Sequence, residues 1–511
     1  MKKIYIRLLL WLFVVSAGMV SCIHDDTTGF VNEIPELSIV KVKGEGVNEE
    51  GKKAYAEFMM PVHFEAEVNH SENEVVYEWK VGYVNEWKDG KPVMDSLYLV
   101  SEKPVLEHSF NRVGEFLVRL RVSDGFSSAF YYMMVEIKAG MERGLLVLSS
   151  DDAGKGRLSF CSVLEDANEL LKAKKEDFDW EVWSRINPDY ELVDALDMSL
   201  MDFGKYKNSV FVISKFNRCV YELEPNTLLV LRKIDLTLLV SELNIQPVAL
   251  SPCRDELVVL SENGIVVGSQ LTSNGLMSDA WGAKMKGTKM YQAVIWNDYD
   301  EVTQSMPVVA EDEKLVCYTN LLGKASLDSG TDFEGRRIVN FLIVGNTNLK
   351  KSLLVVSQSK NDPGKVWVTN YVSGIEALWN MEVIFGHESG EEKWSDKSYE
   401  LSAPLTLTEE SDMLYNTKYS NSIFYNSGNS IYRWRHGSDI SEVELVTTVP
   451  GEITCMAQSP DEEYLYVGTY DPAATGLKGS VYIYKTENLQ LVNSFVGVAD
   501  KPLKLFYKDT K

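Results

Sequence analysis

The feature that most constrains the fold is a strand–turn–strand pattern that recurs from Gly144 to the end of the chain. It is clearest when IQPVALSPCRDELVVLSENGIVVGSQ (245–270) is placed on ITCMAQSPDEEYLYVGTYD (453–471) with the later GSVYIYK (479–485). Both give an apolar strand ending in Ser-Pro, a charged turn, a second strand, a loop and a third strand. The Ser-Pro pairs begin at Ser251 and Ser459, a spacing that fits four propeller blades of about 50 residues each.

Other segments extend this pattern to both ends of the region. KPLKLFYK (501–508) is a first strand with no blade after it, whereas GLLVLSS (144–150) and GRLSFCSV (156–163) are second and third strands without a first. Joining these ends would close a ring and remove exposed sheet edges. Three-strand units also occur at 209–235, 336–372 and 421–449.

The sequence therefore predicts an all-β chain in which residues 141–511 form a β-propeller. Roughly 365 residues at about 50 each give seven blades, with six or eight as alternatives. A stack of further β-sandwich domains is the other fold considered. It leaves the two terminal half-blades unexplained.

A smaller all-β domain is predicted over residues 36–140. FMMPVHFEAEV (58–68), VVYEWKVG (75–82) and EFLVRLRVSD (115–124) alternate apolar and polar residues, as half-buried strands do. The Tyr77-Glu78-Trp79 strand, and the later strand that runs from Gly114 to Asp124, resemble the polycystic-kidney-disease-like (PKD) branch of the immunoglobulin-type sandwiches. The alternation places Trp79 in the core rather than against a ligand.

The first 22 residues carry a targeting pattern. Basic residues precede an apolar stretch from Leu8 to Val15, and small residues lead to Cys22. The stretch is far shorter than the ~20 residues that span a bilayer. The segment resembles the lipobox of bacterial lipoproteins, which implies a signal peptide of residues 1–21 and lipidation of Cys22. An ordinary secretory signal with an incidental cysteine is the alternative.

Two acidic residues, Asp25 and Asp26, follow in a polar tether of residues 22–35. They resemble the acidic export signal of Bacteroidetes surface lipoproteins. That resemblance implies a chain anchored to the outer membrane by lipid and facing the cell exterior.

The order of parts also resembles a family: PKD-like lipoproteins of Bacteroidetes encoded beside SusC/SusD-type outer-membrane importers. The family shows a lipobox, a PKD-like domain, and a domain that opens on a strand such as Gly144-Leu145-Leu146-Val147-Leu148. The resemblance implies nutrient capture or scaffolding beside such an importer and its other lipoproteins, with a peptide or a glycan as the ligand.

The net charge limits the kinds of partner that the chain can bind, and the cysteine spacing bears on disulfides and metal sites. Removal of residues 1–21, which hold three basic and no acidic residues, changes the formal net charge from −24 to −27. Such a surface repels phosphate backbones and disfavours nucleic-acid binding. The six cysteines form no CxxC pair, and Cys161, Cys219 and Cys317 stand in strand-like runs, where they are predicted to be small buried apolar residues.

Catalytic motifs are absent from the sequence. It holds no HExxH, GxSxG, GxxxxGK[ST] or GxGxxG pattern, and its six histidines lack the spacing of metal ligands. We therefore predict no catalytic residue, no metal and no cofactor. Carboxylates are abundant, however, and the spacing that glycoside hydrolysis needs is spatial. A propeller glycoside hydrolase or lyase with carboxylates in the central funnel remains the alternative to a non-catalytic binding protein.

Aromatic residues in long loops are the predicted ligand-binding residues. Trp87, Trp281 and Trp394 lie in polar, Gly-rich insertions, and exposed aromatic rings on loops stack on sugars or bind partner proteins. Trp367 and Trp434 alternate instead as blade-core residues do.

Overall fold

The computed structural model describes residues 37–510 except for 70–73, 202–207, 238–244, 254–255, 271–280, 291–293, 296–303, 311–313, 320–323, 329–331, 345–351, 373–394, 401–405, 420–421 and 436–442. The chain divides into two compact units between Lys138 and Ala139. Among the described residues, no helix is long and apolar enough to cross a membrane. The predicted signal peptide and tether lie outside the described residues.

The first unit is a β-sandwich. One sheet has the strand order β1–β3–β7, formed by Ser38–Gly44, Pro61–Asn69 and Val105–Ser109. The other has the order β2–β9–β8–β4–β5, with β6 (Tyr98–Ser101) also paired to β4. Its strands are β2 (Lys53–Glu57), β9 (Ser128–Lys138), β8 (Gly114–Ser123), β4 (Val76–Lys88) and β5 (Lys91–Met94).

The sandwich core holds the tryptophan that the alternation placed there. Trp79 is 1% exposed, and its indole N–H donates to the Lys103 carbonyl at 2.9 Å. Phe64, Val118 and Leu120 are buried in the same unit. The prediction that Trp79 is a core residue is confirmed.

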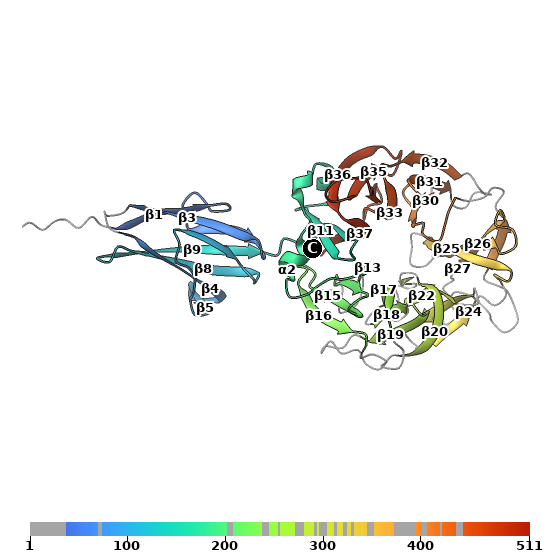
Figure 1. The fold of residues 1–511 in the computed structure, drawn as a ribbon, viewed down its shortest axis with the longest axis horizontal. Coiled ribbons are helices and arrows are strands. Elements are labelled where there is room, and N and C mark those ends of the chain that lie inside the picture. The colour runs from blue at the N-terminus through green and yellow to red at the C-terminus, as the bar shows by residue number, and fades with distance from the viewer. Residues whose placement is uncertain are drawn as a thin grey trace, which may run out of the picture. The chain divides into compact units, whose positions relative to one another are not determined.

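The second unit is built from antiparallel sheets arranged around a ring (Figure 1). The first sheet contains β12, β11, β10 and β37, so it combines strands from both ends of the unit. The bounds of these strands are Phe178–Asp179, Gly156–Ser162, Arg143–Ser150 and Lys501–Asp509. The loop between β11 and β12 carries two 3-10 turns, Ala167–Leu171 and Lys175–Asp177, and α2 (Val182–Ile186) follows β12.

The remaining sheets follow one another along the chain. In order, they contain β13–β16 (Ala195–Leu200, Val210–Ser214, Cys219–Leu223, Val230–Asp235), β17–β20 (Pro247–Cys253, Glu256–Ser261, Ile265–Gln270, Trp281–Met290), β20–β24 (β21 Val294–Ile295, β22 Gln304–Ala310, β23 Leu315–Thr319, β24 Lys324–Asp328), β25–β28 (Arg336–Val344, Ser352–Ser359, Val366–Val372, Ser395–Glu400), β29–β32 (Met413–Asn416, Ser422–Ser427, Ser430–Arg435, Val443–Thr448) and β33–β36 (Glu452–Gln458, Tyr464–Tyr470, Gly479–Lys485, Leu491–Ala499).

Strand β20 belongs to two consecutive blades. Its first part pairs with β19, with Ile265 opposite Lys286, and its last part pairs with β22, with Met290 opposite Val308. It is therefore the last strand of the third blade and the first strand of the fourth. Counted this way, the described strands form seven blades, the number predicted from the sequence.

The ring closes through the two terminal segments, 144–163 and 501–508, as the sequence predicts. Strand β37 pairs antiparallel with β10, with Leu148 opposite Lys504 and Gly144 opposite Lys508. The predicted fold, a PKD-like sandwich followed by a propeller closed by its two ends, is confirmed.

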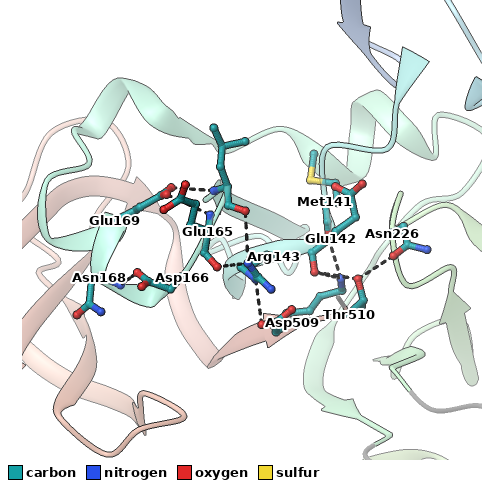
Figure 2. A network of polar contacts seen from close by, with 12 residues as sticks. Met141, Glu142, Arg143, Glu165, Asp166, Asn168, Glu169, Asn226, Asp509 and Thr510 are labelled. Atoms are coloured by element: carbon teal, nitrogen blue, oxygen red, sulfur yellow. Dashed lines mark hydrogen bonds and ion pairs between the residues drawn. The ribbon is translucent and has the colours of Figure 1, made fainter. Parts of the chain in front are cut away.

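The closing seam between β37 and the first residues of the unit is rich in polar contacts (Figure 2). Arg143 pairs with Asp509 at 2.9 Å, and the Thr510 hydroxyl bonds to the Glu142 carbonyl and to Asn226. The buried Lys508 ammonium donates to the Met141 carbonyl at 2.7 Å. Burial lowers the pKa of Lys508 to about 8.

The blade cores confirm most of the predicted interior residues. Trp434 is buried with Tyr425 and Ile423, whereas Trp367 is half-buried under the guanidinium of Arg336. Cys161 and Cys219 are buried and unpaired, and the side chain of Cys317 is outside the described residues.

Candidate functional site

A cavity of about 460 Å³ lies where the innermost strands of the propeller converge. All seven blades contribute to its wall through β37, β13, β17, β20, β25, β33 and the segment that leads into β29. This is the central funnel in which the enzyme alternative placed its carboxylates. Its polar lining residues include Asp197, Lys289, Asn340, Glu409, Glu410, Asp412, Gln458 and Lys504.

Three of these side chains link one blade to the next. One Asp197 carboxylate oxygen accepts the Leu250 N–H at 3.1 Å, and one Asp412 oxygen accepts the Met456 N–H at 2.7 Å. The Asn340 amide donates to the Ser411 carbonyl at 2.7 Å. These bonds satisfy backbone groups of neighbouring inner strands that no ladder partner reaches.

Four charged groups alternate in sign around the cavity. Lys504 comes from the first blade, Asp197 from the second, Lys289 from the fourth and Asp412 leads into the sixth. The lining also holds Glu409 and Glu410, so groups of both signs face the cavity and the acidic ones outnumber the basic ones.

The protonation of these groups follows from burial and from their mutual charges. Burial alone would lower the pKa of Lys504, but the charges of Asp197 and Asp412 outweigh it and raise that pKa above its usual value. Burial raises the pKa of both aspartates, and the charge of Lys504 partly offsets this. Lys504 therefore carries its proton at neutral pH.

The two lysines differ in how far their hydrogen bonds are satisfied. The Lys289 ammonium donates to the Glu409 carbonyl at 2.9 Å and to the Asn340 side chain at 3.3 Å. Burial lowers its pKa. Lys504 is an exposed residue that lines the cavity, and no described residue is a hydrogen-bond or ion-pair partner of its ammonium. The Lys504 ammonium is thus the charged group of the cavity with the most unused donors.

The acidic residues beside the cavity are partly engaged. Glu409 pairs with Arg337 at 2.9 Å, and a hydrogen bond from Thr408 lowers the pKa of Glu410. Within the part of the chain that the structure describes, no cluster of three or more His, Cys, Asp or Glu side chains could hold a metal ion.

Of the binding residues predicted from the sequence, only the side chain of Trp87 is among the described residues. Trp87 lies in the sandwich unit, is 51% exposed and donates its indole N–H to Glu115. Trp281 begins β20, but its side chain is outside the described residues, as are Trp394, Cys22, Asp25 and Asp26 in full. The binding and lipidation roles of these residues remain predictions.

Sequence reasoning missed the charged residues of the cavity. Asp197, Asp412 and Lys504 are more than 90 positions apart and share no motif. One sequence feature could have indicated the cavity. Lys504 is a charged residue in KPLKLFYK (501–508), which the sequence predicts to be the first strand of a blade and therefore to line the centre of the ring. Such a charge needs a partner, which would have directed attention to acidic residues on other first strands.

Among the comparisons with known proteins, a family model matches part of the first unit. Residues 47–130 match the PKD domain family, and no curated protein matches the chain. A quinonprotein alcohol dehydrogenase-like protein from Bacteroides thetaiotaomicron is 13% identical, with a TM-score of 0.49 over 89% of this chain and 96% of that one.

Two further solved structures are more distant. The Dos1 propeller is 10% identical, with a TM-score of 0.39 over 70% of this chain and 85% of that one. A DUF4784 family protein from Bacteroides caccae is 8% identical, with a TM-score of 0.29 over 92% and 99% of the two chains.

Proposed function

We propose that this chain is a lipoprotein on the outer face of an outer membrane, where it captures a small polar nutrient as a non-catalytic accessory of a SusC/SusD-type importer. Cys22 would carry the lipid, and Asp25 and Asp26 would direct the chain outward. The support for this setting is the sequence resemblance together with the order of a PKD domain and a propeller.

The observation that carries the binding role is the central cavity. Its volume of about 460 Å³ falls within the ~300–1,000 Å³ of small-molecule sites, and such sites use a few converging polar groups for specificity. Here the converging polar groups come from six of the seven blades of the ring, which holds them in place before a ligand arrives.

The way the aspartates are bonded favours binding over catalysis. Asp197 and Asp412 each have one oxygen occupied by a backbone N–H of the next blade. Asp197 also accepts the Met198 N–H with its other oxygen. A carboxylate used in this way stabilises the ring and has little freedom to exchange protons with a substrate.

One observation favours the enzyme as a second candidate. Two carboxylates whose pKa is raised by burial face one cavity, and general acids in glycoside hydrolysis have raised pKa values. Assays with glycoside substrates would separate the candidates, because an enzyme loses its turnover in the Asp412→Asn variant.

Co-purification tests the proposed setting. An affinity-tagged chain extracted from its native outer membranes should bring down an importer pair, and the Cys22→Ser variant should leave the membrane fraction and lose that pair. Recovery of the tagged chain without any importer component would contradict the accessory role. Retention of Cys22→Ser in the membrane would contradict the anchor.

A further inference from the structure

We propose that the central cavity binds a short peptide with free termini, through its carboxylate on Lys504 and its ammonium group on the aspartate side of the cavity. This inference rests on the proposed function, because it names the class of nutrient that the same cavity takes.

The first step concerns the unused donors of Lys504. Lys504 is an exposed residue that lines the cavity, and its ammonium has no hydrogen-bond or ion-pair partner among the described residues. A ligand carboxylate would form charge-assisted hydrogen bonds with it, which are shorter and stronger than neutral ones. Lys289 adds a second positive group, although two of its three donors are already used.

The second step concerns the negative groups. One oxygen of Asp412 bonds to the Met456 N–H, and its other oxygen makes no hydrogen bond to the residues that the structure describes. This oxygen, with Glu410 nearby in the lining, offers acceptors for a ligand ammonium. The alternation of sign around the cavity therefore matches a ligand that carries one charge of each sign.

The same lining disfavours the competing nutrient class. Neutral sugars bind on exposed aromatic rings, and Phe506 is the only aromatic side chain among the described residues that line the cavity. A polyanion is disfavoured too, because Asp197, Asp412 and Glu410 would repel it.

Size limits the length of the peptide. An extended residue spans about 3.3–3.6 Å, so a cavity of about 460 Å³ holds a few residues and not a long chain. A peptide short enough to fit places both of its ends in the cavity, where its two charges can meet their partners.

Calorimetry on the whole chain in detergent tests the inference with defined probes. Tri-alanine should bind, while N-acetyl-tri-alanine and tri-alanine amide should each bind at least tenfold more weakly. Maltotriose should not bind. Equal affinity for the capped and free peptides would overturn the proposal, and this arm requires no mutant.

Matched variants locate the site. Lys504→Met should weaken tri-alanine binding at least tenfold, and Lys504→Arg should retain most of it. Lys501→Met is the control, because Lys501 is an exposed lysine on the same strand that lies against Tyr470. Unchanged binding in Lys504→Met would overturn the proposal.

The outcomes separate this inference from the proposed function. Binding of maltotriose that Asp412→Asn abolishes would overturn the peptide assignment and leave nutrient capture standing. If neither probe class binds the wild-type cavity, the peptide assignment fails. If the importer pair still co-purifies, the scaffolding part of the proposed function stands.

Discussion

Two lysines four positions apart on β37 experience opposite environments. Lys508 lies in the closing seam, where its ammonium donates to the Met141 and Glu142 carbonyls. Burial lowers its pKa to about 8. Lys504 lies in the central cavity, where the charges of Asp197 and Asp412 outweigh burial and raise its pKa.

The contrast distinguishes a charged group that stabilises the fold from one that can bind a ligand. In the seam, a buried ammonium is matched by neutral carbonyls, so the charge is costly but its donors are satisfied. In the cavity, the charge is compensated at longer range, and the donors have no partner among the described residues. A charged group whose donors are used by the protein stabilises the fold, whereas one whose donors face a cavity is available to a ligand.

The largest expected effect comes from the residue between the two lysines. Leu505 is 2% exposed and packs in the core shared by the first and seventh blades. Leu505→Ala should lower the free energy of unfolding by about 2–5 kcal/mol, because it leaves a cavity behind. Urea unfolding measures this.

Leu491→Ala is the matched control for that variant. Leu491 is 47% exposed on β36, so its replacement should change stability by less than about 0.5 kcal/mol. Equal effects of the two variants would show that β37 does not close the ring.

The next effect concerns the pH dependence that Lys508 imposes on stability. Its folded pKa is about 8 and its ordinary value is 10.5, so between these values the unfolded chain binds more protons than the folded one. The free energy of unfolding should therefore rise with pH from about 8 to 10.5, by an amount on the order of 3 kcal/mol. Urea unfolding at a series of pH values measures it.

Lys508→Met isolates this contribution. The difference in unfolding free energy between wild type and variant should change across that pH window and be constant below about pH 8, where Lys508 is protonated in both states. A difference that is constant across pH 8–10.5 would show that Lys508 has an ordinary pKa in the fold.

The seam and the cavity also differ in how far they could be predicted from the sequence. The half-blades at 144–163 and 501–508 predicted the closure, because strand patterning is a local property of the chain. Asp197, Asp412 and Lys504 meet only after the ring has formed, since their inner strands belong to different blades. No local sequence pattern therefore predicts that these three side chains lie around one cavity. Loop composition predicts exposed rings at Trp87, Trp281 and Trp394, and Trp87 is 51% exposed, but composition carries no information on which side chains converge.

A smaller effect is expected from removal of one charge in the cavity. Asp412→Asn keeps an acceptor for the Met456 N–H but removes one of the charges that raise the pKa of Lys504. The pKa of Lys504 should fall, and stability should change by about 1 kcal/mol. NMR of reductively ¹³C-methylated lysines measures the pKa, and the signal missing in Lys504→Arg identifies the resonance.

Asp152→Asn is the control, because Asp152 pairs with Lys478 on the surface. If Lys504 titrates alike in both Asn variants, the coupling is absent.

The smallest effect on stability is expected at Trp87, whose hydrogen bond to Glu115 lies on the surface of the sandwich unit. Trp87→Phe removes that bond but keeps an aromatic ring, and water replaces the lost partner, so the unfolding free energy should change by less than about 0.5 kcal/mol. Urea unfolding followed by circular dichroism measures it. A loss above about 1.5 kcal/mol would show that an exposed, water-accessible bond can stabilise as strongly as the buried seam. A small loss would leave the Trp87 ring free for the ligand contact that the sequence predicts.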